Sequence, residues 1–199
     1  MPSIAKVKFD QSVVGAQVLS SFCGTASGSV DQNFVDQVCL RAAVANVVGC
    51  WEGYVEGVLR EFVAKVRVQS HRRTWTLIAQ YESLVDRLAA DLNTPSWDRA
   101  RDLLVTVTGM DPYSAWIWGP KFANQNDTKE FFDGVMKVRH AFAHGFAVPH
   151  SVPHLTAPGQ LCSAYFEDAR ACTQFFVEKT DELLEHELKH RHSCVSGWT

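Results

Sequence analysis

The sequence predicts an all-α fold, because helical periodicity runs through most of its 199 residues. Apolar side chains recur every three or four residues over long stretches, which is the pattern of amphipathic helices. Glycine and proline gather in a few short segments, where helices are expected to end. A hydrophobic content of 46% is ordinary for a globular protein and excludes wholesale disorder.

Five helices are predicted along the chain. They share apolar residues at helical spacing and cover residues 31–66, 75–92, 96–107, 127–144 and 163–189. Ser29 with Gln32 and Asp127 with Glu130 match capping boxes, and Ser96 is a third N-cap. The helices over 31–66 and 163–188 are expected to pack closely together, with no central sheet.

Three segments are not predicted to be helical. Residues 109–126 hold two prolines and two glycines and read as a packed loop insertion. Its Trp116 and Trp118 are expected to fill the bundle or a dimer face rather than stack on RNA bases. Residues 145–162 form an ordered crossing loop. The chain is therefore divided into an N-terminal extension, 1–30, a single helical domain, 31–190, and a C-terminal tail, 191–199. If the chain has a β-hairpin, it is expected in the extension.

Bulk properties narrow the class of protein. A net charge of −3 gives no overall attraction to nucleic acid, and the basic run over 60–73 is expected to be a solvated helix end. Six irregularly spaced cysteines without a C-x-x-C pair are typical of free thiols in a reducing compartment. No secretory pattern appears, and the apolar stretch 42–49 is too short to cross a bilayer. We therefore expect a cytoplasmic protein without a membrane partner.

Residues 138–145, Val-Arg-His-Ala-Phe-Ala-His-Gly, hold the groups best suited to chemistry. Arg139 is a permanent planar cation that can grip a phosphate with paired donors. His140 and His144 lie one helical turn apart, and histidine is the residue type best suited to proton transfer near neutral pH. Arg139 lies ~140° around an ideal helix from His144, so the two converge only if Gly145 lets the helix end unwind. Alternatively, Arg139 pairs with a buried glutamate and His144 simply complements the helix C-terminus.

This segment resembles the R-x4-H motif of HEPN domains, and Cys50–Glu56 resembles the Trp-Glu-x-Tyr stretch of their RiboL-PSP-like branch. The resemblance covers residues 31–188 and implies a HEPN-like bundle of at least four helices. It implies that Arg139 and His144 are the catalytic pair and that His140 holds the polar position after the arginine. Glu52 matches a carboxylate that orients Arg139, so either Glu52 or Glu56 should approach it.

By this resemblance the chain is a metal-independent RNA endonuclease with no cofactor, serving as a toxin or in defence against phage beside an antitoxin or regulatory protein. Cleavage by the 2′-hydroxyl of RNA needs a base, an acid and a cation. One arginine and one histidine per chain are too few, so a homodimer would double the set. The alternative is a non-catalytic HEPN module that binds RNA, a nucleotide or a protein.

The His-rich segment over 185–194 is the rival site. His186 and His190 are spaced to share a metal, to which His192 or Cys194 would add a ligand. Terminal tracts of this kind are usually solvated and frayed, so no functional metal site is predicted. The sequence has no P-loop and no G-x-S-x-G motif, the signatures of nucleotide hydrolysis and serine-hydrolase chemistry.

Overall fold

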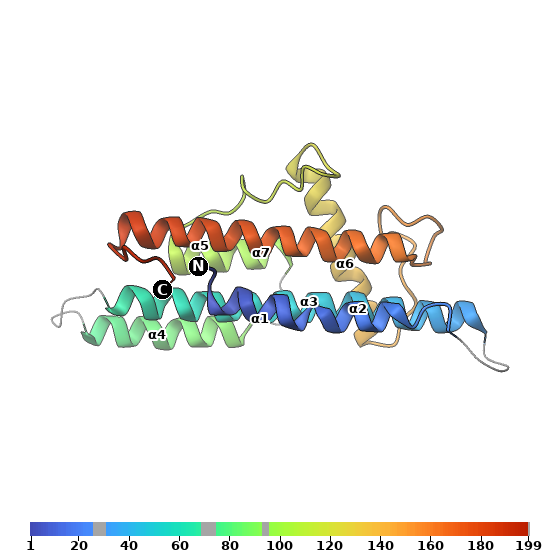
Figure 1. Cartoon of the computed structure of the whole chain (residues 1–199), viewed down its shortest axis with the longest axis horizontal. Coiled ribbons are helices and arrows are strands. Elements are labelled where there is room, and N and C mark those ends of the chain that lie inside the picture. Colours follow the sequence, from blue (N-terminus) through green and yellow to red (C-terminus); the bar gives the residue numbers. More distant parts are fainter. Residues whose placement is uncertain (26–30, 69–74, 93–95, 199) are drawn as a thin grey trace.

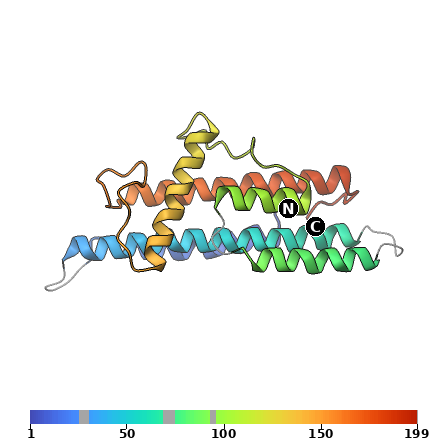
Figure 2. The same ribbon diagram turned by 180° about the vertical axis from the view of Figure 1, so that it is seen from behind.

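The computed structural model describes residues 1–25, 31–68, 75–92 and 96–198. Within these ranges it holds no β-strand, only the bridge Ala157–Gln160, and the prediction of an all-α bundle is confirmed. The described helices are α1 (Ile4–Ser12), α2 (Val14–Ser21), α3 (Gln32–Val68), α4 (Trp75–Ala90), α5 (Trp97–Thr108), α6 (Gln125–Ala143) and α7 (Ser163–Arg191). Most run along the length of the molecule, and α6 crosses them steeply (Figures 1 and 2).

The long helix α3 organises the bundle, because it packs against every other described helix. Its closest companion is α7, which confirms the predicted pairing of these two segments. Val48, Trp51 and Val55 of α3 have no exposed surface, and Phe176 and Leu184 of α7 are equally buried. Burial of side chains of this size on one shared core is the main source of the fold's stability.

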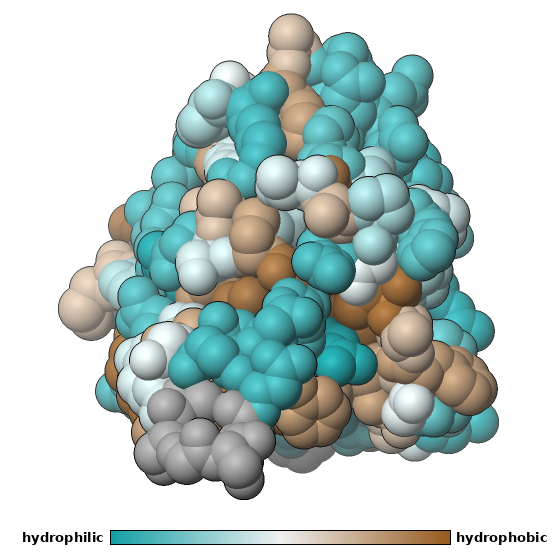
Figure 3. Space-filling model, turned by 90° about the vertical axis from the view of Figure 1, so that its right-hand side faces the viewer, coloured by the Kyte–Doolittle hydropathy of each residue, from teal (hydrophilic) through white to brown (hydrophobic). Residues whose placement is uncertain are grey.

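Among the described helices, α3 alone is long and apolar enough to cross a membrane by length and composition. The core helix of a soluble protein passes the same test, and Val48, Trp51 and Val55 of α3 are buried in the core of the bundle. At the end of the bundle on the right of Figure 1, hydrophobic and hydrophilic residues are interspersed (Figure 3).

The helix boundaries follow local capping chemistry. Ser96 caps α5 as predicted, since its side chain accepts a hydrogen bond from the Arg99 amide. The predicted capping box of Asp127 and Glu130 is wrong, because the side chain of Asn124 accepts the Asp127 amide at 2.9 Å and α6 begins earlier. The predicted Ser29 cap lies outside the described residues.

The N-terminal segment is helical, which corrects the expectation of a possible β-hairpin there. Ala5, Phe9, Val13 and Ala16 recur at helical spacing and are all buried, mainly against α3. The tail is also more ordered than predicted: Cys194 and Trp198 are buried in the core, while α7 runs on through Arg191. Both ends of the chain therefore contribute to the bundle.

A buried carboxylate ties the two ends together. The amide of Ser3 donates to Asp181 of α7 at 3.1 Å, and the hydroxyl of Ser3 donates to the same carboxylate. The indole N–H of Trp198 donates to the Asp181 carbonyl at 3.3 Å, and the N- and C-termini lie close together in Figure 1. Burial raises the pKa of Asp181, although the hydrogen bonds from Ser3 and the nearby Lys6 oppose it.

This raised pKa predicts a pH-dependent stability difference. A carboxyl whose folded pKa lies above its unfolded value stabilises the fold most when protonated, and this contribution is lost as pH rises through the folded pKa. We therefore expect the melting temperature of wild type, minus that of Asp181→Asn, to fall as pH rises above about pH 4. Thermal unfolding followed by circular dichroism measures this difference, with exposed Glu182→Gln as the control. A difference that rises with pH would contradict the assignment.

Candidate functional site

The C-terminal end of α6 is closed by a glycine-dependent cap. Gly145 has a φ of +69°, its amide donates to the Phe142 carbonyl at 3.2 Å, and the Phe146 amide donates to the Ala141 carbonyl at 2.8 Å. This pair of hydrogen bonds is a Schellman motif. The His144 amide still donates to the His140 carbonyl at 3.2 Å, so the helical hydrogen-bond pattern continues up to His144, the C-cap residue of α6.

The cap corrects the expectation that the helix end would unwind. Because Gly145 turns the chain after His144 rather than before it, Arg139 and His144 keep their helical separation of ~140°. Arg139 faces α3, whereas His144 is exposed at the end of α6. One chain therefore does not direct both side chains at a single point.

Arg139 forms an ion pair with Glu52 across the contact between α6 and α3. The guanidinium and carboxylate approach to 3.9 Å, with 28% and 23% of the two side chains exposed. The predicted approach of a carboxylate from the Cys50–Glu56 stretch is thus confirmed for Glu52. Glu56 instead pairs with Arg60 at 3.1 Å, one turn further along α3.

The aromatic residues of the same stretch belong to the core. Trp51 is fully buried, with ring centroids 5.7 Å from Trp116 and 6.1 Å from Phe176. The Tyr54 hydroxyl donates to the Val177 carbonyl of α7 at 3.1 Å. Trp51 and Tyr54 therefore fix α3 against α7 and the loop before α6, and Glu52 is left at the edge of this cluster.

The loop tryptophans pack as predicted. Trp116 has no exposed surface, and its indole N–H donates to the Thr180 hydroxyl at 3.0 Å. Trp118 is also buried and stacks on Phe131 of α6 at 5.9 Å. These side chains fill the bundle and are not presented to a nucleic acid.

His140 and His144 form a second pair of side chains beside the first. Their ring centroids lie 4.4 Å apart with an interplanar angle of 49°, and both residues are exposed. The His144 ring also lies against Phe146, at a centroid distance of 5.9 Å. The structure therefore brings the predicted site residues together as two neighbouring pairs, Arg139 with Glu52 and His140 with His144.

The rival His-rich segment does not assemble into a cluster of metal ligands. The Nδ1 atom of His190 lies 2.8 Å from the His186 carbonyl, while the His192 ring packs on Phe62 at 5.5 Å. The Cys194 thiol faces the Lys65 carbonyl. Over the described ranges, no group of three or more His, Cys, Asp or Glu side chains is placed to hold a metal ion.

The two arginines in the described part of the basic run pair with acidic neighbours. Arg60 pairs with Asp86 at 3.1 Å in addition to Glu56, and Arg67 pairs with Glu82 at 3.2 Å. Residues 71–73 of the run lie outside the described residues. The described part behaves as the solvated helix end that the sequence predicts.

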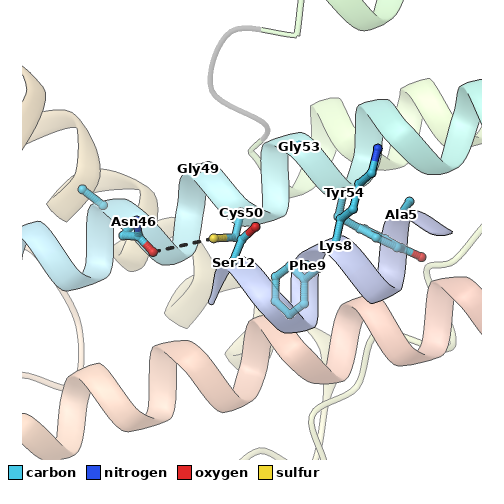
Figure 4. Close-up of a pocket in the computed structure, with 10 residues that line it drawn as sticks. Ala5, Lys8, Phe9, Ser12, Asn46, Gly49, Cys50, Gly53 and Tyr54 are labelled. Atoms are coloured by element: carbon cyan, nitrogen blue, oxygen red, sulfur yellow. Dashed lines mark hydrogen bonds between the residues drawn. The ribbon is translucent and has the colours of Figure 1, made fainter. Parts of the chain in front are cut away.

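A groove between α1 and α3 was not predicted from the sequence. It has a volume of about 520 Å³ and includes Lys8, Ser12, Asn46 and Cys50 in its lining (Figure 4). The signal that could have located it is the series Gly49, Gly53 and Gly57, four residues apart on α3. Ala5 of α1 packs against Gly57, whereas the space beside Gly49 and Gly53 is open.

Two glycine substitutions should have opposite effects on stability. A Cβ atom at Gly145 or at Gly53 meets nothing within 4 Å, so backbone conformation alone decides the outcome. Gly145→Ala forces an L residue into the left-handed region and should destabilise the protein by about 1 kcal/mol, whereas Gly53→Ala in mid-helix should stabilise it by up to about 1 kcal/mol. Urea unfolding of both variants measures the two free energies, and a shift of the same sign in both would refute this account.

Compared with protein-family models, curated proteins and solved structures, the chain matches none of them. What is established is an all-α bundle that presents an arginine–glutamate pair and a histidine pair on the last turns of α6.

Proposed function

We propose that this chain is a HEPN-type RNA endonuclease that acts as a homodimer through Arg139 and His144 without a metal cofactor. The observation that carries the proposal is the Arg139–Glu52 pair, held across α3 and α6 within about one turn of two exposed histidines. The HEPN-like identity of the bundle is part of the proposal and rests on the two sequence motifs at these positions.

Each group has a role in cleavage by the 2′-hydroxyl of RNA. Arg139 stabilises the charge on the phosphate, and Glu52 holds the arginine in place. A guanidinium carries five N–H donors, and a single carboxylate cannot accept hydrogen bonds from all of them. Pairing with Glu52 is therefore compatible with phosphate binding. His144 transfers the proton, because imidazole is a common proton-transfer group in enzymes and this side chain is exposed to a substrate in solvent. Because the reaction uses the 2′-hydroxyl as its nucleophile, the substrate is restricted to RNA.

The homodimer follows from the separation of Arg139 and His144 around the helix. Because the two side chains of one chain diverge, a two-fold axis near the end of α6 would set His144 of the partner subunit beside Arg139. Both exposed apolar side chains next to this end, Phe142 and Phe146, would lose contact with water in such a dimer. The second copy thus completes the set of acid, base and cation.

The direct test is incubation of the purified full chain with total RNA in excess EDTA. Cutting should persist and leave 2′,3′-cyclic phosphate or 3′-phosphate ends, because histidine and arginine supply the chemistry. Light scattering at micromolar concentration should report a dimer. Loss of cutting in EDTA, or a monomer that cuts at full rate, would refute the mechanism.

The biological setting is proposed on the same basis. An RNA-cleaving protein meets its substrate in the cytoplasm, where it would act as a toxin or in defence against phage. An activity of this kind needs restraint, so an antitoxin or regulatory protein is the expected partner.

The second candidate is a non-catalytic interaction module that binds RNA, a nucleotide or a protein. The groove between α1 and α3 favours it, because exposed glycine backbone beside Lys8 and Ser12 offers a concave binding surface away from the histidines. Tight RNA or nucleotide binding without any cutting, unaffected by His144→Ala, would favour this candidate over the nuclease.

A further inference from the structure

His140 and His144 have the spacing of a metal chelate on one helix. The backbone hydrogen bond from His144 to His140 keeps the two residues about one turn apart, at i and i+4. Their ring centroids are 4.4 Å apart and both residues are exposed, so the rings are accessible from solvent. Neither ring makes an ion pair with a carboxylate in the described part of the chain.

The ring separation can be compared with the requirement of a metal ion. Two imidazole nitrogens bound at about 2.1 Å place their ring centroids about 4.6 Å apart for a right angle at the metal and about 5.3 Å apart for a tetrahedral angle. The observed 4.4 Å is closest to the right-angled case. Right angles between ligands belong to square-planar and octahedral ions, of which Ni²⁺ and Cu²⁺ bind imidazole strongly.

The electrostatic surroundings also suit a cation. The carbonyl end of α6 carries partial negative charge, which favours positive charge in the last turn. Arg139 is the nearest fixed cation along the helix, and Glu52 offsets it through their ion pair. Mg²⁺ and Ca²⁺ prefer oxygen ligands, so this site of two nitrogens discriminates against them.

We propose that His140 and His144 form a two-nitrogen site for a divalent transition-metal ion of the Ni²⁺ type, and that the bound ion inhibits the nuclease. Water completes the coordination of the ion. A metal-bound His144 no longer has its lone pair available to take or deliver a proton, so cleavage stops while the ion is bound. Inhibition, but not metal binding, rests on the proposed function.

The chain contains a matched pair for comparison. His186 and His190 of α7 have the same spacing, but their rings are stacked at 3.9 Å with an interplanar angle of only 19°. Nearly parallel rings direct their in-plane lone pairs alongside one another rather than toward one shared point. Chelation there requires the rings to separate first, so the pair on α6 should bind the ion more tightly.

Isothermal titration calorimetry with Ni²⁺ tests the site without reference to RNA, on the full chain freed of any histidine tag. We expect one saturable Ni²⁺ per chain in wild type, on the order of tenfold or more weaker binding in His140→Ala, and unchanged binding in His186→Ala. Melting temperatures confirm that both exposed substitutions leave the fold intact. Binding that survives His140→Ala, binding that is lost in His186→Ala, or no binding in wild type would overturn the proposed site.

The inhibition is tested by the ratio of RNA-cutting rates with and without Ni²⁺. This ratio should fall at least about tenfold for wild type and stay near one for His140→Ala, whatever the basal rate of that variant, and Mg²⁺ should not lower it. A wild-type rate unchanged at saturating Ni²⁺ would overturn the inhibition. A protein that binds Ni²⁺ through these histidines but cuts no RNA would refute the nuclease and leave the metal site established.

Discussion

Replacement of His144 by alanine should reduce RNA cleavage by about 100- to 10,000-fold, the range lost with a positioned proton-transfer group. The effect on stability should be small, because His144 is exposed at the end of α6 and is not part of the buried core. Its interaction with the helix C-terminus is worth about 0.3–1 kcal/mol. This variant should therefore lose most of its RNA-cleaving activity while its free energy of unfolding changes little.

The comparison needs three variants and one measurement. Mapping the 3′ ends of cut RNA in EDTA gives the rate and the chemistry for each. Arg139→Lys should also be severely impaired, since an ammonium keeps the charge but loses the paired donors. His140→Ala should do less harm, because that position need only be polar. If His144→Ala cuts like wild type, the proposed nuclease mechanism is wrong.

Trp51→Ala should cause the largest loss of stability, about 3–5 kcal/mol, as expected for deletion of a fully buried indole. The ring contacts Tyr54, Trp116, Phe132 and Phe176, and its loss leaves a cavity that these side chains cannot fill without moving. A deficit of this size is a large fraction of the stability of a typical domain.

Glu52→Gln, at the adjacent position, is the matched control. The Arg139–Glu52 pair is partly exposed and 3.9 Å long, so its loss should cost less than about 1 kcal/mol. RNA cleavage should nevertheless fall, because Arg139 loses the carboxylate that orients it. Chemical denaturation compares the free energies of unfolding of the two variants. Equal losses of stability would contradict the view that Trp51 stabilises the core while Glu52 serves the site.

The sequence by itself determined the helices. Apolar residues at helical spacing placed the segments that became α3, α4, α5, α6 and α7 to within about two residues at most ends. The cap at Ser96 and the end of the helix before Gly145 were also readable, because each depends on one residue and its immediate neighbours. The grouping of Glu52 with Arg139 was predictable from two motifs, although spacing alone gave no reason to prefer Glu52 over Glu56.

Only the tertiary structure decided which partner each group found. The N-terminal segment was difficult to classify because two short helices gain most of their stability by packing on α3, not from their own sequence. Glu52 rather than Glu56 meets Arg139 because the crossing of α6 over α3 selects one turn of the longer helix. The same crossing directs Arg139 inward and leaves His140 and His144 in solvent. Periodicity fixes which residues share a face of a helix, but the neighbour on which that face packs depends on contacts between residues far apart in the chain.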